Sequence, residues 1–311
     1  MKSNRWFAWA AFLLSAGIVV LSVDLASELF QRRPIVPAVS RIRPDLARFR
    51  ALADVPGAPV ALNRLLIARQ TPGLTINSFQ LVYGERDNQW TVLIDTGVDA
   101  RLYEDLNPRE IFYPKAYERF EIELARTEAL YFTRESFDHV GGVSRSPSLY
   151  GIRDRLKFTY VQLRSPFLKE ARIPPAVLEA MSAIDCDAIC SPAPGIVLFA
   201  APGATPGAQW IYVRLVTGRE YLLVGEKSIS LQEIQTLRPR QSRFAYWAAG
   251  HNGEVIAHQL RALHTLFSEN KSLVILPVHD ESALIKATEA GYLGDGFDYD
   301  SPFSWPAGTE R

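Results

Sequence analysis

The chain has 311 residues, a formal net charge of zero at neutral pH and a hydrophobic content of 48%. This composition is typical of an ordinary globular core, and the length suits one large domain with an appendage. The lack of a basic excess argues against a nucleic-acid-binding protein. Two cysteines are too few for a scaffold that depends on disulfides. Nothing in these values indicates an oligomeric state.

The N-terminus carries Lys2 and Arg5, followed by an apolar segment of 18 uncharged residues from Trp6 to Val23. This length is near the lower limit for a helix that spans a bilayer, and the preceding positive residues favour a cytoplasmic N-terminus. A cleaved signal peptide is the alternative, but Asp24 stands where a cleavage site needs a small residue. We therefore expect residues 1–30 to be a membrane anchor, with the following domain in the periplasm or otherwise outside the cytoplasm.

The segment 31–73 is rich in proline and arginine, with one plausible helix around Pro44 to Val55. We interpret it as a tether, so that the globular domain would span 74–311. The two β-rich runs Phe79–Tyr83 and Trp90–Ile94 flank a polar turn, which predicts a hairpin at the start of this domain.

Downstream of the hairpin, helical patterns alternate with short apolar runs. The expected helices are 109–126, 175–184, 254–267 and 281–290, and the expected strands are 129–132, 158–163, 196–200, 210–216, 221–224 and 273–276. This grouping indicates a mixed α and β fold.

The only two cysteines, Cys186 and Cys190, lie in an insert between Ser165 and Pro194. They would form a local disulfide if the domain lies outside the cytoplasm, and buried thiols are the alternative. Two cysteines without neighbouring ligands are a weak metal site.

The stretch Tyr131–Gly142 reads YFTRESFDHVGG: a strand end, then Asp138 and His139 side by side on a glycine-supported turn. An acid and an imidazole at the carboxyl end of a strand are where α/β proteins tend to place chemistry. The stretch resembles the signature T-H-x-H-x-D-H-x-G-G of the metallo-β-lactamase superfamily, except that Arg134 and Ser136 replace its first two histidines.

Four more segments resemble the loops of this family, in the family's order. They are LIDTG at 93–97, PGATPG at 202–207 with Ala204 in place of a histidine, VGE at 224–226 and LPVH at 276–279. The resemblance covers most of Leu74 to Phe297 and implies an α+β fold, a four-layer αββα sandwich. With the expected anchor, this sandwich would follow an N-terminal transmembrane helix.

The resemblance also implies a half-preserved metal site. The three histidines that hold the family's first metal correspond to Arg134, Ser136 and Ala204. The ligands of its second metal correspond to Asp138, His139, Glu226 and His279, with Glu226 in place of the bridging aspartate and Asp95 in a supporting role. We therefore expect one divalent metal, zinc, at these four residues.

Arg134 is expected to act with Asp138 in the chemistry of the site. One divalent cation plus Arg134, against Asp138 and Glu226, gives a formal charge of +1, so Arg134 would stand in for the missing cation and hold an anionic group of a small-molecule ligand. The alternative is a salt bridge from Arg134 to Asp138 or Glu226 in a site without metal.

Two functions follow from these alternatives. The first is a membrane-anchored hydrolase with one metal and an unknown substrate. The second is a catalytically inactive relative that binds a ligand or a partner protein through the same pocket, because one fold of this kind serves many functions.

Overall fold

The structure is a computed structural model that describes residues 43–70, 73–85, 88–106, 111–238 and 253–297. The expected anchor, Trp6 to Val23, lies outside these ranges. Within them, no helix is both long enough and apolar enough to cross a membrane.

Two β-sheets form the centre of the molecule. The seven-stranded sheet has the order β12 (Gly294–Asp295), β1 (Ala61–Arg69), β2 (Thr75–Tyr83), β3 (Trp90–Ile94), β5 (Ala129–Tyr131) and β6 (Leu156–Lys157), with β4 (Ile111–Phe112) paired to β1. The five-stranded sheet has the order β11 (Leu273–Pro277), β10 (Glu220–Val224), β9 (Gln209–Arg214), β8 (Ile196–Ala200) and β7 (Ile189–Ala193).

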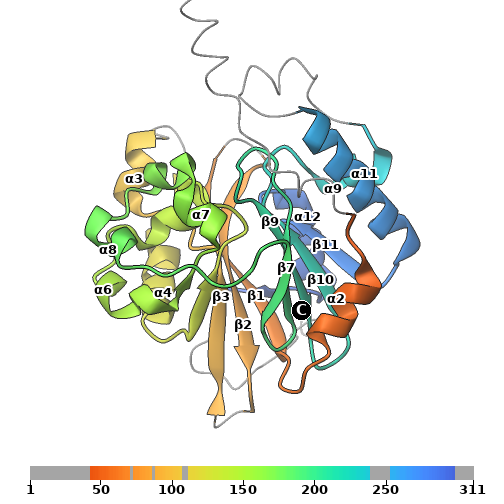
Figure 1. Cartoon of the computed structure of the whole chain (residues 1–311), viewed down its shortest axis with the longest axis horizontal. Coiled ribbons are helices and arrows are strands. Elements are labelled where there is room, and N and C mark those ends of the chain that lie inside the picture. Colours follow the sequence, from red (N-terminus) through yellow and green to blue (C-terminus); the bar gives the residue numbers. More distant parts are fainter. Residues whose placement is uncertain (1–42, 71–72, 86–87, 107–110, 239–252, 298–311) are drawn as a thin grey trace, which may run out of the picture.

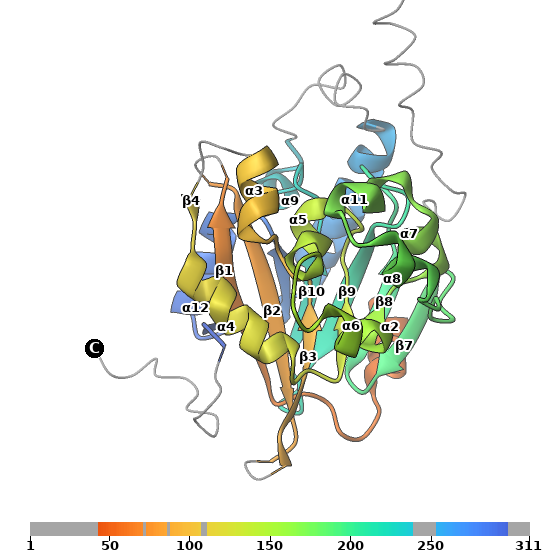
Figure 2. The same ribbon diagram turned by 90° about the vertical axis from the view of Figure 1, so that its left-hand side faces the viewer.

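Helices cover the outer face of each sheet, as Figure 1 shows. The seven-stranded sheet is covered by α3 (Ala100–Leu106), α4 (Pro114–Leu124), α5 (Phe137–Val140), α6 (Leu149–Ile152) and α8 (Pro175–Glu179), with α7 (Tyr160–Arg164) nearby, and Figure 2 looks onto this layer. The five-stranded sheet is covered by α2 (Leu46–Ala53), α9 (Leu231–Thr236) and α11 (Gly253–Glu269), while α12 (Glu281–Glu289) follows β11. The expected αββα sandwich is confirmed.

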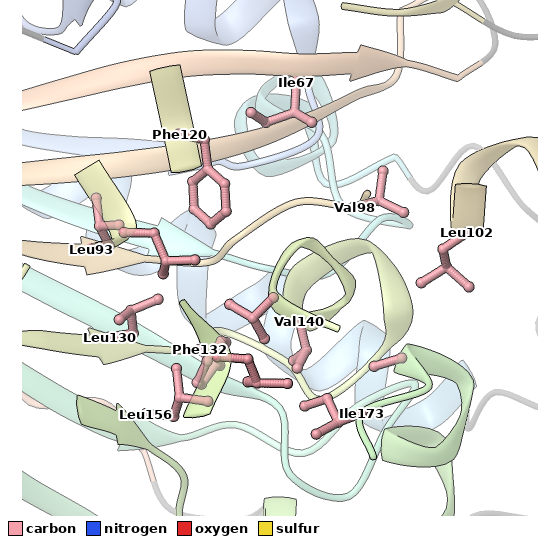
Figure 3. Close-up of a cluster of buried hydrophobic side chains, with 14 of the residues drawn as sticks. Ile67, Leu93, Val98, Leu102, Phe120, Leu130, Phe132, Val140, Leu156 and Ile173 are labelled. Atoms are coloured by element: carbon pink, nitrogen blue, oxygen red, sulfur yellow. The ribbon is translucent and has the colours of Figure 1, made fainter. Parts of the chain in front are cut away.

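Three apolar cores hold the layers together, and β10 shows how its sequence serves two of them. Tyr221 and Leu223 pack between the two sheets, whereas Leu222 and Val224 pack under the helices. Successive side chains of a strand point to opposite faces, so a strand buried on both faces needs an uninterrupted apolar run. Figure 3 shows the third core, in which Leu93 and Leu130 of the first sheet lie near Phe120 of α4.

The domain begins earlier than the sequence suggests. Strand β1 pairs with β2 along most of its length, and α2 packs on the outer face of the five-stranded sheet through Leu46 and Phe49. The described residues before Leu74 therefore belong to the body of the domain. The predicted tether, 31–73, is wrong for the part of it that the structure describes. The charge of Arg64 suggests an exposed position, but this residue of β1 is buried, and its Nε donates to Asn77 Oδ1 at 2.7 Å.

One expected strand is also wrong. The run 158–163 contains helix α7, because Thr159 and Gln162 form a capping box that starts a helix at Tyr160. A short apolar run does not by itself distinguish a strand from a buried helix.

The topology brings four strand ends to one place. Strand β3 is parallel to β5, and β10 is parallel to β11, so each pair presents its carboxyl ends at the same edge of its sheet. Two backbone hydrogen bonds then join the two edges: Gln209 N donates to Thr133 O at 2.9 Å, and Thr75 N donates to His279 O at 3.0 Å. The loops that follow these four strands carry four of the five motifs found in the sequence, and the fifth, at 202–207, follows β8.

Candidate metal centre

Three metal-ligating side chains converge where the two sheets meet. Asp138, His139 and His279 are buried, and one ligand atom from each lies within 4.8 Å of the others. His279 Nε2 is 2.9 Å from His139 Nε2. Asp138 Oδ2 is 3.5 Å from His279 Nε2 and 3.7 Å from His139 Nε2. Three of the four predicted ligands therefore lie together.

Helix α5 places the first two of these ligands. It begins after Ser136, so Asp138 and His139 occupy its single turn. Ser136 Oγ donates to Asp138 Oδ1 at 2.7 Å, which leaves Asp138 Oδ2 to face the two imidazoles. Ser136, which stands where the sequence resemblance expects a histidine, orients the neighbouring aspartate.

The ring of His139 is oriented from behind by Asp95 and Thr133. His139 Nδ1 lies 3.0 Å from Asp95 Oδ2 and 2.9 Å from Thr133 Oγ1. Thr133 also donates to Asp95 through its amide, at 2.8 Å, and its hydroxyl, at 2.6 Å. Asp95 adopts a left-handed φ of 57°, a rare conformation for a non-glycine residue that hydrogen bonds at a functional site can hold. Asp95 thus occupies the supporting position that its sequence motif predicts.

His279 is oriented from the opposite side. Its Nδ1 lies 2.8 Å from the carbonyl oxygen of Thr75, which can only accept a hydrogen bond, so we assign the ring proton to Nδ1. The same reasoning assigns a proton to Nδ1 of His139, which faces the Asp95 carboxylate. Burial, and then the neighbouring His139, hold the pKa of His279 well below its usual value, so this ring is neutral near pH 7.

With these tautomers the two Nε2 lone pairs face each other at 2.9 Å, and two acceptors cannot hydrogen-bond without a proton or cation between them. The oxygen of Asp138 adds a third electron-pair donor to the same space. A zinc ion at about 2.0–2.1 Å from each nitrogen would separate them by about 3.4 Å in tetrahedral geometry. A displacement of about half an ångström would create that geometry, so these residues fit a divalent metal.

Lys227 also reaches this cluster. Its Nζ lies 2.8 Å from Asp138 Oδ2 and 5.3 Å from the centre of the Phe137 ring. Burial opposes ionisation of Asp138, but Lys227 is the foremost of the neighbouring charges that bring its pKa well below the ordinary value. Lys227 was not predicted from the sequence, although it directly follows Glu226 in the loop after β10.

Glu226 lies with a different set of partners. Its Oε2 accepts from the amide of Ala204 at 3.0 Å, and its Oε1 accepts from Ser228 Oγ at 3.0 Å. Arg134 Nη1 is 3.6 Å from Glu226 Oε1. Among the described residues, Glu226 is not part of the group of three that could hold a metal, and it contacts Arg134 instead.

Arg134 is buried, with 8% of its side chain exposed. In the described part of the chain its Nε and Nη1 have no hydrogen-bond acceptor. Burial opposes the charge of this guanidinium, but Glu226 and then Asp138 raise its pKa above the ordinary value. Arg134 is therefore a charged group held beside the cluster by attraction to carboxylates, with donors to spare.

A further buried acid, Glu135, was not singled out in the sequence. It accepts hydrogen bonds from Thr205 Oγ1 at 2.8 Å and from the amide of Gly207 at 2.9 Å. It thereby ties the loop that carries Ala204 to the loop that carries Arg134. Its position beside Arg134 in the sequence is the only signal that could have suggested this role.

The insert of the second half of the chain contains the disulfide. Cys186 and Cys190 are bonded to each other, and their Cα atoms are 5.4 Å apart. Of the two alternatives left open by the sequence, the structure contains the disulfide. It lies at the rim of the core between the sheets, where both residues are partly buried.

The two facing sheets with outer helices, and the cluster at their joined edges, define the metallo-β-lactamase fold. The chain has this fold, and the resemblance seen in the sequence is confirmed at that level. No protein-family model matches the chain, and no curated protein matches it in sequence.

Solved structures with the same fold include N-acyl homoserine lactone hydrolases. One, with the product N-hexanoyl-L-homoserine at its catalytic metal center, has a TM-score of 0.53 and 14% identity, over 72% of this chain and 95% of that one. A quorum-quenching N-acyl homoserine lactone lactonase has a TM-score of 0.53 and 16% identity, over 72% and 94%. A B. thuringiensis protein with N-decanoyl-L-homoserine at its active site has a TM-score of 0.52 and 14% identity, over 72% and 95%. At these identities the likeness shows the fold alone.

Proposed function

We propose that this protein is a metal-dependent hydrolase that binds a single divalent ion, zinc, through Asp138, His139 and His279. The observation that carries the proposal is the pair of Nε2 atoms held 2.9 Å apart, each with its other ring nitrogen already engaged as a donor. An arrangement that presents three electron-pair donors to one point is stabilised by a cation. The catalytic metal center of a lactone hydrolase with the same fold adds support.

A divalent ion bound there would polarise a substrate oxygen or lower the pKa of a bound water. The side chains of this protein would hold the ion and bind the substrate. Asp138, His139 and His279 would leave a fourth position open for water or substrate, as catalytic zinc sites do. Arg134 would bind a negative group of a small-molecule substrate. Glu226 stays a predicted ligand, but its present contacts suit it better to hold Arg134 in place.

An inactive relative is the second candidate, and a specific observation favours it. The ion pairs of Lys227 with Asp138 and of Arg134 with Glu226 each place a cation beside a buried carboxylate without any metal. In that case the pocket would bind a ligand or a partner protein and perform no hydrolysis.

Metal analysis of the purified full-length chain distinguishes these two functions. One zinc per chain is expected after growth and purification with zinc present, and Asp138→Asn and His279→Ala should each abolish it. His264→Ala is the matched control, because His264 bonds Ile234 O on the helical layer, away from the cluster. Metal content near zero, with stability unaffected by a chelator, would favour the inactive relative.

We further propose that the N-terminal segment anchors the domain to a membrane, outside the cytoplasm. The uncharged run Trp6–Val23 supports the anchor, and the Cys186–Cys190 disulfide is the kind of bond that oxidising compartments maintain. The full-length protein should stay with membranes through alkaline carbonate washing. An intact soluble chain that starts near Ser27 would instead indicate a cleaved signal peptide.

A further inference from the structure

We propose that Lys227 and the metal exchange places on Asp138, and that the displaced lysine then binds, together with Arg134, an oxyanion of the substrate. The inference rests on the one-metal site proposed above, and it assigns to that site a class of substrate and a residue that the family resemblance does not provide.

The exchange follows from competition for one oxygen atom. Asp138 Oδ1 is engaged by Ser136, so Oδ2 is the atom left to coordinate a metal with the two histidines. Lys227 Nζ lies 2.8 Å from that same Oδ2. A divalent ion about 2 Å from Oδ2 would repel an ammonium group held this close. The metal and Lys227 therefore cannot both keep these positions.

Lys227 is free to leave because it is not enclosed. Its side chain is 29% exposed, whereas that of Asp138 is 1% exposed. The Phe137 ring, 5.3 Å from Nζ, remains available as a cation–π partner after the ion pair is broken. A flexible four-carbon side chain can thus move its charge from Asp138 toward solvent without any change in the backbone.

Arg134 provides the second cation of the proposed oxyanion site. It is nine-tenths buried, and its Nε and Nη1 lack hydrogen-bond acceptors in the described part of the chain. The carboxylate of Glu226 is 3.6 Å from Nη1, too far for a normal hydrogen bond. A planar guanidinium with unused donors is suited to a carboxylate or phosphate oxygen pair.

A bound divalent ion would make the cluster two charges more positive. Without it, Lys227 is paired with Asp138 and Arg134 with Glu226, and Glu135 and Glu170 also act on Arg134. Metal binding would take Asp138 from Lys227 and leave this lysine without its carboxylate partner. An oxyanion, which a carboxylate-bearing substrate would supply, suits the displaced Lys227 together with the unused donors of Arg134.

The first test compares zinc affinity in the full-length protein and in two variants. Lys227→Met removes the competing charge and should tighten zinc binding about tenfold. Lys227→Arg keeps a charge and should stay close to the wild-type value. Lys271→Met, on the surface near Phe267, is the control. Equal affinity in wild type and Lys227→Met would overturn the exchange while leaving the metal site intact, and no zinc in any variant would remove the proposed function as well.

The second test follows the lysine itself. Reductive methylation read by mass spectrometry should modify Lys227 slowly in the metal-free chain and faster once zinc is bound, with Lys271 as an internal reference. Acetate, at constant ionic strength, should then slow the modification of Lys227 in zinc-loaded wild type but not in zinc-loaded Arg134→Met. Zinc that leaves the rate at Lys227 unchanged would overturn the exchange. Acetate without effect on zinc-loaded wild type would overturn the oxyanion site.

Discussion

Asp95 Oδ2 lies 3.0 Å from His139 Nδ1, across 44 residues of sequence. This contact fixes the tautomer of the histidine and directs its Nε2 toward His279. Because Asp95 is itself held in a left-handed conformation by the amide and hydroxyl of Thr133, the loops after β3 and β5 form one unit. The orientation of a proposed metal ligand therefore depends on a residue that does not touch the metal.

The first prediction tests this dependence. Asp95→Asn keeps the shape of the side chain but weakens its attraction for the Nδ1 proton of His139. Zinc affinity should fall by about 10–100-fold, the usual effect of losing a group that orients a ligand. Isothermal titration with zinc measures the change, and circular dichroism reports whether the fold is kept. A folded variant with wild-type affinity would show that Asp95 serves only the backbone of its loop.

The second prediction concerns the close approach of Gly225 to the same unit. A Cβ atom at this position would lie 2.3 Å from Thr133 Oγ1 and 3.3 Å from His139 Cε1. Gly225→Ala should therefore destabilise the fold by about 1–3 kcal/mol and displace the imidazole. Both urea unfolding and zinc affinity should report the change.

A matched substitution provides the control for Gly225. Gly151 lies in helix α6 and has no atom within 4 Å of a Cβ added there. Gly151→Ala should be neutral or stabilise the fold by up to about 1 kcal/mol, since alanine is the better helix former. If the two variants unfold at the same urea concentration, the loop after β10 is more adaptable than the structure indicates.

The sequence located much of this site because strand ends and glycine turns are local features. Asp138 and His139 are adjacent on the turn after β5 of one sheet, and His279 follows β11 of the other, so the facing of the two sheets brings them together. Glu226 and Lys227 show the limit of such reasoning. They are consecutive residues, yet one pairs with Arg134 and the other with Asp138. Their side-chain directions depend on the path of the loop after β10, which no pattern in the sequence specifies.

In the fold too, the sequence predicts some strands and misses another. It predicts β3, β8, β10 and β11 because strands buried on both faces are uninterrupted apolar runs. Strand β1 was missed because its Asn63 and Arg64 look like surface residues, although both are buried and bonded to Gln80 and Asn77 of the neighbouring strand. Polar pairs across two strands are satisfied only after the sheet has formed, so the linear sequence gives no sign of them.

The third prediction concerns the disulfide. Cys186 and Cys190 are four residues apart, so the bond closes a small loop, and the loop-closure model assigns it about 2 kcal/mol. A Cys186→Ser, Cys190→Ser double variant should lose no more than this amount in urea unfolding and should keep its zinc content. Protein purified from its native source without reductant should show no free thiol after alkylation under denaturing conditions. Two free thiols in such protein would count against both the disulfide and the extracytoplasmic location.

The last prediction concerns pH and the attachment of α2 to the five-stranded sheet. Arg50 donates from Nε and Nη2 to the two carboxylate oxygens of Glu220, each at 2.6 Å, and Tyr212 adds a hydrogen bond from its hydroxyl. Burial favours the neutral acid, but these donors outweigh it and lower the pKa of Glu220. A carboxyl group whose pKa is lower in the folded state stabilises the protein above its unfolded pKa, and this contribution disappears as the pH falls through the folded pKa.

Glu220→Gln should therefore lower the stability by about 1 kcal/mol near pH 7, since Arg50 is partly exposed. The difference between wild type and variant should shrink as the pH falls below the ordinary glutamate pKa of 4.5. Arg50→Met should show the same pH dependence, because it removes the other half of the pair. Urea midpoints measured between neutral and acidic pH test this. A difference that stays constant over the whole range would mean that Glu220 acts through packing and that its ionisation does not hold α2 in place.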